Sequence, residues 1–177
     1  MRRQLSKLTL AAILTAMGVA IAPFLWFPFL TAKAYPGQHM INVLAGILLG
    51  PWWAMLVAFL IGMIRINLGI GTIYAIPGGI PGAFIVGVFY QILKKLKAKP
   101  EIAAFTEPLG TVFIGGTLSV YIVAPMIGHS QMIGALIPVW IVFGASSFSG
   151  SVLGFILIEV LKKIGILEFF EVEENSE

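Results

Sequence analysis

Long apolar runs that almost no charged residue interrupts are the feature that most restricts how this chain can fold. Three of them cover residues 8–30, 108–128 and 136–161. Because an α-helix rises about 1.5 Å per residue, each run can cross the roughly 30 Å of hydrocarbon in a lipid bilayer. A fourth, shorter run, 78–93, ends in a lysine cluster typical of a headgroup layer. Only 11% of the residues are charged, too few to cover a water-facing surface, so the sequence predicts an all-α integral membrane protein.

The stretch 39–67 is apolar almost throughout but is interrupted by Gly50-Pro51. It can form one long tilted helix, since membrane helices tolerate proline, or two short helices joined by a tight turn. The positions of the basic residues favour the second alternative. Lysine and arginine prefer the cytoplasmic side of a membrane. They form three clusters, near the N-terminus, at 94–99 and at 162–163. All three clusters lie on one side only if an even number of membrane spans separates each cluster from the next. Folding 39–67 in two meets that condition.

The sequence therefore predicts a single membrane domain over 1–167 with six transmembrane helices and with the N- and C-termini cytoplasmic. We expect these helices at 8–30, 38–50, 52–67, 78–93, 108–128 and 136–161. A cleaved signal peptide is the rival interpretation of the N-terminus, but the first apolar run is longer than the usual stretch of about 7–15 residues and contains two prolines. Five of the eight acidic residues lie within 168–177, which predicts an acidic, solvated cytoplasmic tail.

One face of the first predicted helix carries only small side chains. Ala12, Ala16 and Ala20 recur every four residues, which places them in one row along the helix. Membrane helices associate through such faces because small side chains let two backbones approach closely. Two interpretations are open at this point: packing against another helix of the same chain, or docking of a separate membrane subunit.

In the six-helix arrangement, polar side chains at membrane depth gather in the outer half. Such residues are costly in hydrocarbon, so each one is a candidate for a binding site. Gln38, His39 and Asn42 open the second predicted helix, and Arg65 and Asn67 close the third. Further candidates in the outer parts of later segments are Tyr74, Tyr121, Trp140 and Ser147. A pocket of imidazole, guanidinium, amide, phenol and indole groups suits a small polar heteroaromatic molecule.

Each candidate also has a purely structural interpretation. Tyrosine and tryptophan are common at membrane interfaces, Arg65 can extend its side chain to the outer headgroups, and His39 can be a packing residue. The first outer loop, Thr31–Gln38, contains Tyr35 and is either a lid over the pocket or a plain connection. Glu107 lies at a predicted helix start, and we interpret it as a structural residue that interacts with the helix dipole.

Motifs of enzymes and metal sites are missing from the sequence. There is no phosphate-binding glycine loop, nucleophile elbow or zinc signature, and there are no cysteines. We therefore expect no catalytic residue, no metal, no cofactor and no nucleic acid partner. An intramembrane enzyme would have to use Ser147 with His39 or His129, and a stand-alone channel lacks a continuous polar path. Active transport would need a partner protein as its energy source.

In its motifs the chain resembles the substrate-binding S components of energy-coupling factor (ECF) transporters. It shares with them six short predicted helices, the alanine face of the first helix and a predicted cytoplasmic N-terminus. More narrowly, three segments are similar to the ThiW family, which is assigned to hydroxyethylthiazole, the thiazole precursor of thiamine. They are PGQHMINVLAGILLGPWWA at 36–54, the Arg65 region running into Gly71-Thr72, and EPLGT at 107–111. The resemblance extends from the first helix to about Lys163.

This resemblance implies a transport cycle. An S component captures a vitamin-type substrate from outside, with the first loop as a gate, and docks onto a transmembrane T subunit driven by two cytosolic ATPases that use ATP. The alanine row becomes the docking face, and Gln38, His39 and Asn42 become ligand candidates. We therefore expect a non-enzymatic S component of a prokaryotic cell membrane that binds hydroxyethylthiazole. The alternatives are an S component for another small heteroaromatic vitamin or metabolite, and a stand-alone membrane facilitator.

Overall fold

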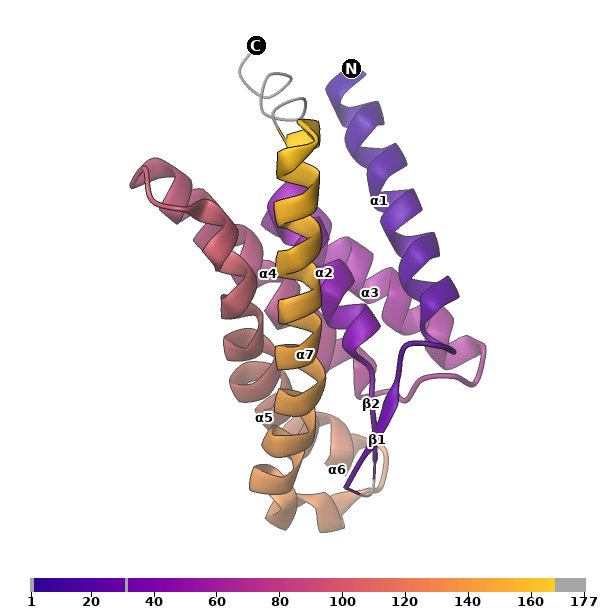
Figure 1. Cartoon of the computed structure of the whole chain (residues 1–177). Helices are drawn as coiled ribbons and strands as arrows, with labels where there is room; N and C mark the ends of the chain where they lie inside the picture. The colour runs from indigo at the N-terminus through magenta and orange to yellow at the C-terminus, as the bar shows by residue number, and fades with distance from the viewer. Residues whose placement is uncertain (1, 31, 168–177) are drawn as a thin grey trace.

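The computed structural model describes residues 2–30 and 32–167, so the acidic tail predicted at 168–177 lies outside the described residues. The fold is a bundle of helices with a short β-hairpin at one end (Figure 1). In chain order, the elements are α1 (Arg2–Ile21), β1 (Phe27–Phe29), β2 (Ala32–Ala34), α2 (Pro36–Leu49), α3 (Pro51–Asn67), α4 (Ala75–Lys95), the 3₁₀-helix η1 (Pro100–Thr106), the π-helix η2 (Leu109–Gly115), α5 (Gly116–Leu118), the π-helix η3 (Ser119–Val123), α6 (Ala124–Met126), the 3₁₀-helix η4 (Ser130–Ala135) and α7 (Leu136–Lys163).

Helix α2 forms the core of the bundle. Thirteen of its 14 residues are buried, and it packs against α1, α3, α4 and α7. A helix that is apolar on most of its circumference gains most from a position inside the protein, where neighbouring helices cover every face. As a consequence, the polar residues in its first turns are enclosed by protein and do not face lipid.

The chain breaks its helix at Gly50-Pro51, so the two-helix interpretation of 39–67 is confirmed. Gly50 has a φ of +85°, in the left-handed region that favours glycine. Pro51 occupies the first position of α3, where a missing N–H leaves no hydrogen bond unmade. Because α2 and α3 also pack against each other, the chain turns back between them.

The first helix is shorter than predicted at its C-terminal end. We expected it over 8–30, but α1 ends at Ile21, and β1 pairs with β2 in an antiparallel hairpin. The prediction of a purely α-helical fold is therefore wrong at this point. Proline accounts for the difference, since Pro23 and Pro28 cannot donate helical hydrogen bonds and restrict the residues before them. The hairpin leads directly to Tyr35, the residue that precedes α2.

The helix predicted at 108–128 begins earlier, at Pro100, and continues as one helical segment to Met126. Its winding changes between 3₁₀, π and α turns along the way. A 3₁₀-helix rises about 2 Å per residue, so the seven residues of η1 place Glu107 about 14 Å along the helix from its start. Glu107 is fully buried there. The interpretation of Glu107 as a residue at a helix N-terminus is therefore wrong.

Four segments of the described chain are long and apolar enough to cross a membrane: Gln4–Ile21, Ala75–Lys95, Pro100–Met126 and Ser130–Lys163. Helices α2 and α3 are shorter. Figure 1 places the start of α1, the end of α7 and the turn between α4 and η1 toward one end of the bundle, opposite the hairpin. The basic clusters at the ends of α4 and α7 thus lie toward the same end, as the charge argument requires. The six-span arrangement and the cytoplasmic position of the termini stay predictions.

The contact between α4 and η2 requires glycine at position 110. A Cβ added to Gly110 would lie 2.4 Å from the carbonyl oxygen of Pro81, a backbone atom that cannot rotate away. We expect Gly110→Ala to lower the free energy of unfolding by about 1–3 kcal/mol, measured by thermal unfolding in detergent. Gly144→Ala is the matched control, since its Cβ would meet only Val112, at 3.8 Å. Equal unfolding midpoints for the two variants would contradict the close contact.

Candidate functional site

A cavity of about 570 Å³ lies at the hairpin end of the bundle. Its walls come from β2, the first turns of α2 and α4, the end of α3 and the first part of α7. Small-molecule sites typically enclose about 300–1,000 Å³. The wall from α7 is mainly apolar, whereas α2 and α3 contribute polar side chains. The residues concerned are Pro138, Val139, Val142 and Phe143 on α7, and Gln38, His39 and Arg65 on α2 and α3.

Arg65 is a buried cation in the wall of this cavity. It lies in the last turn of α3 and is only 2% exposed. One guanidinium nitrogen donates a hydrogen bond to the side-chain oxygen of Gln38, and the other donates to the carbonyl oxygen of Ile70 at 3.4 Å. The guanidinium carbon also lies 4.2 Å from the centroid of the Tyr35 ring. The Nε atom of Arg65 has no hydrogen-bond partner in the described part of the chain. The groups that do contact the guanidinium are all neutral.

A hydrogen-bond network centred on Glu107 connects α2 to the 100–126 segment. The Oε1 atom of Glu107 lies 2.7 Å from Nδ1 of His39 and accepts a hydrogen bond from the Asn42 amide at 2.9 Å. The hydroxyl of Thr111 is 2.7 Å from the same oxygen. When Nδ1–H donates this hydrogen bond to the carboxylate, a neutral imidazole has Nε2 free as an acceptor. Since His39 lines the cavity, Glu107 fixes the orientation of a ring that faces the site.

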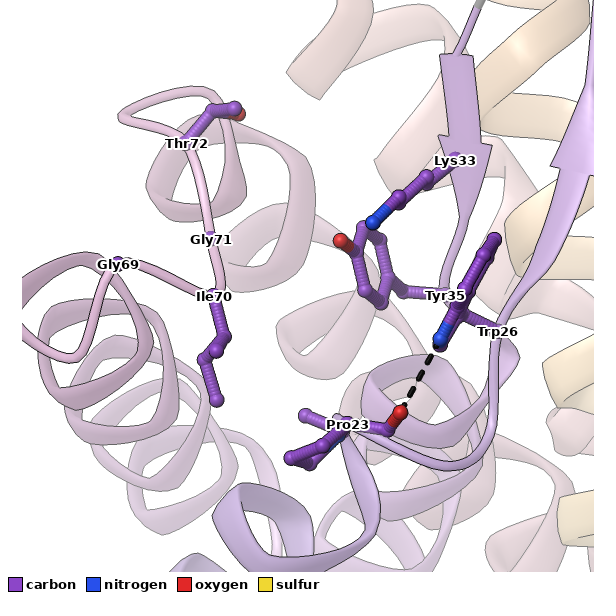
Figure 2. Close-up of a pocket in the computed structure, with 9 residues that line it drawn as sticks. Pro23, Trp26, Lys33, Tyr35, Gly69, Ile70, Gly71 and Thr72 are labelled. Atoms are coloured by element: carbon purple, nitrogen blue, oxygen red, sulfur yellow. Dashed lines mark hydrogen bonds between the residues drawn. The ribbon is translucent and has the colours of Figure 1, made fainter.

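A smaller cavity of about 280 Å³ adjoins the first and shares three lining residues with it, including Lys33 and Tyr35. Figure 2 shows these two side chains facing the loop Gly69–Thr72 across the space. The Lys33 ammonium lies 4.3 Å from the centroid of the Trp26 ring, whose indole donates a hydrogen bond to the carbonyl oxygen of Pro23 at 3.1 Å. The hairpin and the loop after α3 therefore form opposite walls beside the larger cavity.

Tyr74 lines the larger cavity from the residue that precedes α4. Its hydroxyl lies 2.8 Å from Nδ1 of His129 and 3.1 Å from the sulfur of Met132. Partial burial raises the pKa of the Tyr74 phenol above its ordinary value, so the group is neutral near pH 7. Tyr74 thus connects α4 to the segment that leads into α7.

Five predicted binding residues line the cavity: Tyr35, Gln38, His39, Arg65 and Tyr74. A sixth, Asn42, lies behind the wall, in the network around Glu107. Whether these residues contact a ligand stays a prediction. They meet because the doubled-back 39–67 stretch brings the start of α2 and the end of α3 to the same end of the bundle.

The other four predicted residues do not line the cavity. Tyr121 and Asn67 are exposed, and the Asn67 amide donates to a carbonyl of its own helix at 2.8 Å. The Trp140 indole donates to a threonine hydroxyl at 3.3 Å, and Ser147 is buried beside the cavity wall that its neighbour Ser146 lines. Helical phase explains these placements, because a residue one or two positions from a lining residue points about 100° or 200° away around the helix.

Lys33 and Ser146 line the cavity although they were not among the predicted binding residues, and Glu107 was not predicted in the supporting network. One signal for Glu107 was available, since Thr111 follows it by four residues and therefore shares its helix face. Within 2–30 and 32–167, no three His, Cys, Asp or Glu side chains are grouped so that they could hold a metal ion.

A bundle of apolar helices that encloses a partly polar cavity at one end is the architecture of a membrane protein that binds a small molecule. Comparison with known families agrees with this class. Over residues 8–164 the chain matches the family described as ThiW, thiamine-precursor transporter protein, and it belongs to that family. The ThiW resemblance predicted from the motifs is therefore confirmed, and the family is one of transporters. No curated protein and no solved structure matches the chain.

Proposed function

We propose that this protein is the substrate-binding S component of an ECF-type importer in a prokaryotic cell membrane. In this proposal it captures hydroxyethylthiazole, the thiazole precursor of thiamine, from outside the cell. The observation that carries the proposal is the cavity at the hairpin end, whose lining combines aromatic rings with hydrogen-bonding groups on α2 and α3. The family description, which names a thiamine precursor, supports the substrate class.

The cavity offers complementary groups for each part of such a ligand. Nε2 of His39 accepts a hydrogen bond from the ligand hydroxyl, because Nδ1 is already bonded to Glu107. Arg65 donates to the ring nitrogen of the thiazole. The rings of Tyr35 and Tyr74 provide flat apolar surfaces on which a five-membered aromatic ring can stack.

The β1–β2 hairpin is the proposed gate. Its strands have only three residues each, and an isolated hairpin is marginally stable, so little free energy holds it closed. One contact that fastens its end is the backbone N–H of Tyr35, which donates to the Ser146 hydroxyl on α7 at 2.8 Å. Movement of the hairpin would open the cavity on the side away from the start of α1 and the end of α7 (Figure 1).

The alanine face of α1 is the proposed docking surface for the T subunit. Ala12, Ala16 and Ala20 are exposed, whereas Leu14 and Gly18 on the opposite side are buried against the bundle. This exposure favours docking of a separate subunit over packing within the same chain. A row of small side chains on the outside suits close approach of another membrane helix. Two cytosolic ATPases bound to the T subunit would supply the energy.

Titration with hydroxyethylthiazole tests the proposed ligand. We expect saturable binding to the purified protein, and we expect His39→Ala to weaken it by at least about 10-fold, because a buried hydrogen bond to the ligand is lost. Isothermal titration calorimetry measures both effects. Thr117→Ala, which removes a hydroxyl outside the cavity lining, is the control. Absence of saturable binding at millimolar ligand would contradict the substrate assignment.

A further inference from the structure

Two basic residues stand apart from all the others in this chain. Nine of the eleven lysines and arginines fall into the three clusters near the N-terminus, at 94–99 and at 162–163, and the exceptions are Lys33 and Arg65. Although 32 positions separate them in the sequence, both line the 570 Å³ cavity. The fold thus collects the two isolated cations at one site.

Within 2–30 and 32–167, no acidic side chain compensates these charges. The first hundred residues contain no aspartate or glutamate, and the described ranges place no carboxylate within ion-pair distance of Lys33 or Arg65. Glu107 is fully buried and does not line the cavity, and its Oε1 already serves His39 and two other donors. The wall that faces the ligand space therefore carries uncompensated positive charge.

Arg65 also has more donors than its surroundings use. A guanidinium carries five N–H donors; Gln38 and Ile70 accept from two of them, and the Tyr35 side chain also interacts with the group, which leaves donors free for a ligand. The buried Nε has no hydrogen-bond partner among the described residues. At 2% exposure the side chain does not reach the lipid headgroups, so snorkelling does not explain the position of this cation.

We infer that the cavity binds a ligand with an anionic group, a carboxylate or a phosphate, which Arg65 holds with help from Lys33. This inference rests on the proposed thiazole-binding function and changes one part of it: the preferred ligand becomes an acidic derivative of the thiazole precursor, and Arg65 binds the anionic group in place of the ring nitrogen. Burial of a cation is costly unless hydrogen bonds or a counter-charge compensate it, and an anionic ligand supplies the counter-charge that Arg65 lacks among the described residues. The planar fork of arginine matches both oxygens of a carboxylate or two of a phosphate. Lys33, which is exposed at the rim, adds a second positive charge on the ligand's path.

Three ligands that share the 4-methylthiazole ring test whether the cavity prefers a neutral group, a carboxylate or a phosphate. They carry a neutral hydroxyethyl group, a carboxymethyl group of similar size, and a hydroxyethyl phosphate. We expect at least one anionic ligand to bind the wild-type protein at least about 10-fold more tightly than the alcohol, measured by calorimetry. The tighter of the two anions identifies whether carboxylate or phosphate is preferred.

Variants assign the preference to the cavity cations. Arg65→Gln should abolish the preference for the anionic ligand over the alcohol, and Arg65→Lys should retain part of this preference. Lys33→Gln should reduce the preference without abolishing it. Lys95→Gln, which removes an exposed charge at the far end of α4, should leave it unchanged. The comparison of ligands on the wild-type protein stands even if a variant does not fold.

The outcomes distinguish this inference from the proposed function. If the alcohol binds as tightly as both anions, or if Arg65→Gln folds and keeps the preference, the anionic site is wrong and the thiazole-binding function stands. If none of the three ligands binds, both are wrong.

Discussion

Replacement of Glu107 with alanine is expected to destabilise the fold more than any other single change considered for this chain. The substitution leaves Asn42, Thr111 and the imidazole of His39 without the oxygen that they share in the protein interior. Removal of one partner from a buried ionic or hydrogen-bonded pair costs about 3–5 kcal/mol. For a protein of this size, such a loss lowers the midpoint of thermal unfolding by on the order of 10 °C.

Two further variants make this measurement specific. Glu107→Gln keeps a carbonyl oxygen at the same place and should recover much of the lost stability. Glu159→Gln removes a carboxylate that is partly exposed on α7 and should change the midpoint by no more than a few degrees. If Glu107→Ala unfolds at the wild-type temperature, the network does not contribute to stability, and its role would be limited to the orientation of His39.

Substitution of Ala16 by tryptophan is expected to abolish uptake of the substrate while ligand binding stays intact. Ala16 is the middle residue of the exposed alanine row on α1, so an indole there would separate α1 from the proposed T subunit by the thickness of a ring. The cavity lies at the hairpin end, and none of its lining residues comes from α1. Co-purification with the T subunit, uptake of labelled substrate and calorimetry together measure the effect.

Ile122→Trp is the matched control for this variant. Ile122 is also exposed, but it belongs to the 100–126 segment and not to the alanine row. It should assemble and transport like the wild-type protein. Full assembly of Ala16→Trp would mean that the alanine row only faces lipid. Uptake into liposomes by the purified chain alone would favour the alternative of a stand-alone facilitator.

The sequence pattern predicts the depth of the candidate residues in the membrane better than the direction in which their side chains point. Gln38 and Arg65 were expected at the same end of the bundle, and both line the cavity. Asn67 was expected with them, yet it points to the outside because it lies two residues beyond Arg65 on the same helix. Depth follows from the position of a residue along an apolar run. Direction depends on the rotation of each helix about its axis, which packing against the neighbouring helices sets.

Glu107 shows the same limit for the boundaries of helices. Its position before Pro108 suggested a helix start, but the chain winds as a 3₁₀-helix from Pro100 and carries Glu107 into the interior. The expected helix 8–30 failed for a related reason. Its apolar composition is suited to the membrane, but Pro23 and Pro28 end the helix and leave residues for a hairpin.

Local properties of the sequence are enough to predict a helical membrane protein, the helix break at Gly50-Pro51 and the similarity to a family. These features depend on local hydrophobicity, on backbone restrictions and on motifs, all of which can be read without knowledge of distant contacts. The folded structure was needed to show that the alanine row faces outward, that Glu107 supports His39, and that Lys33 and Arg65 share one cavity. Each of these features depends on contacts between residues far apart in the chain. Such contacts form only when each helix packs one of its faces against the neighbouring helices.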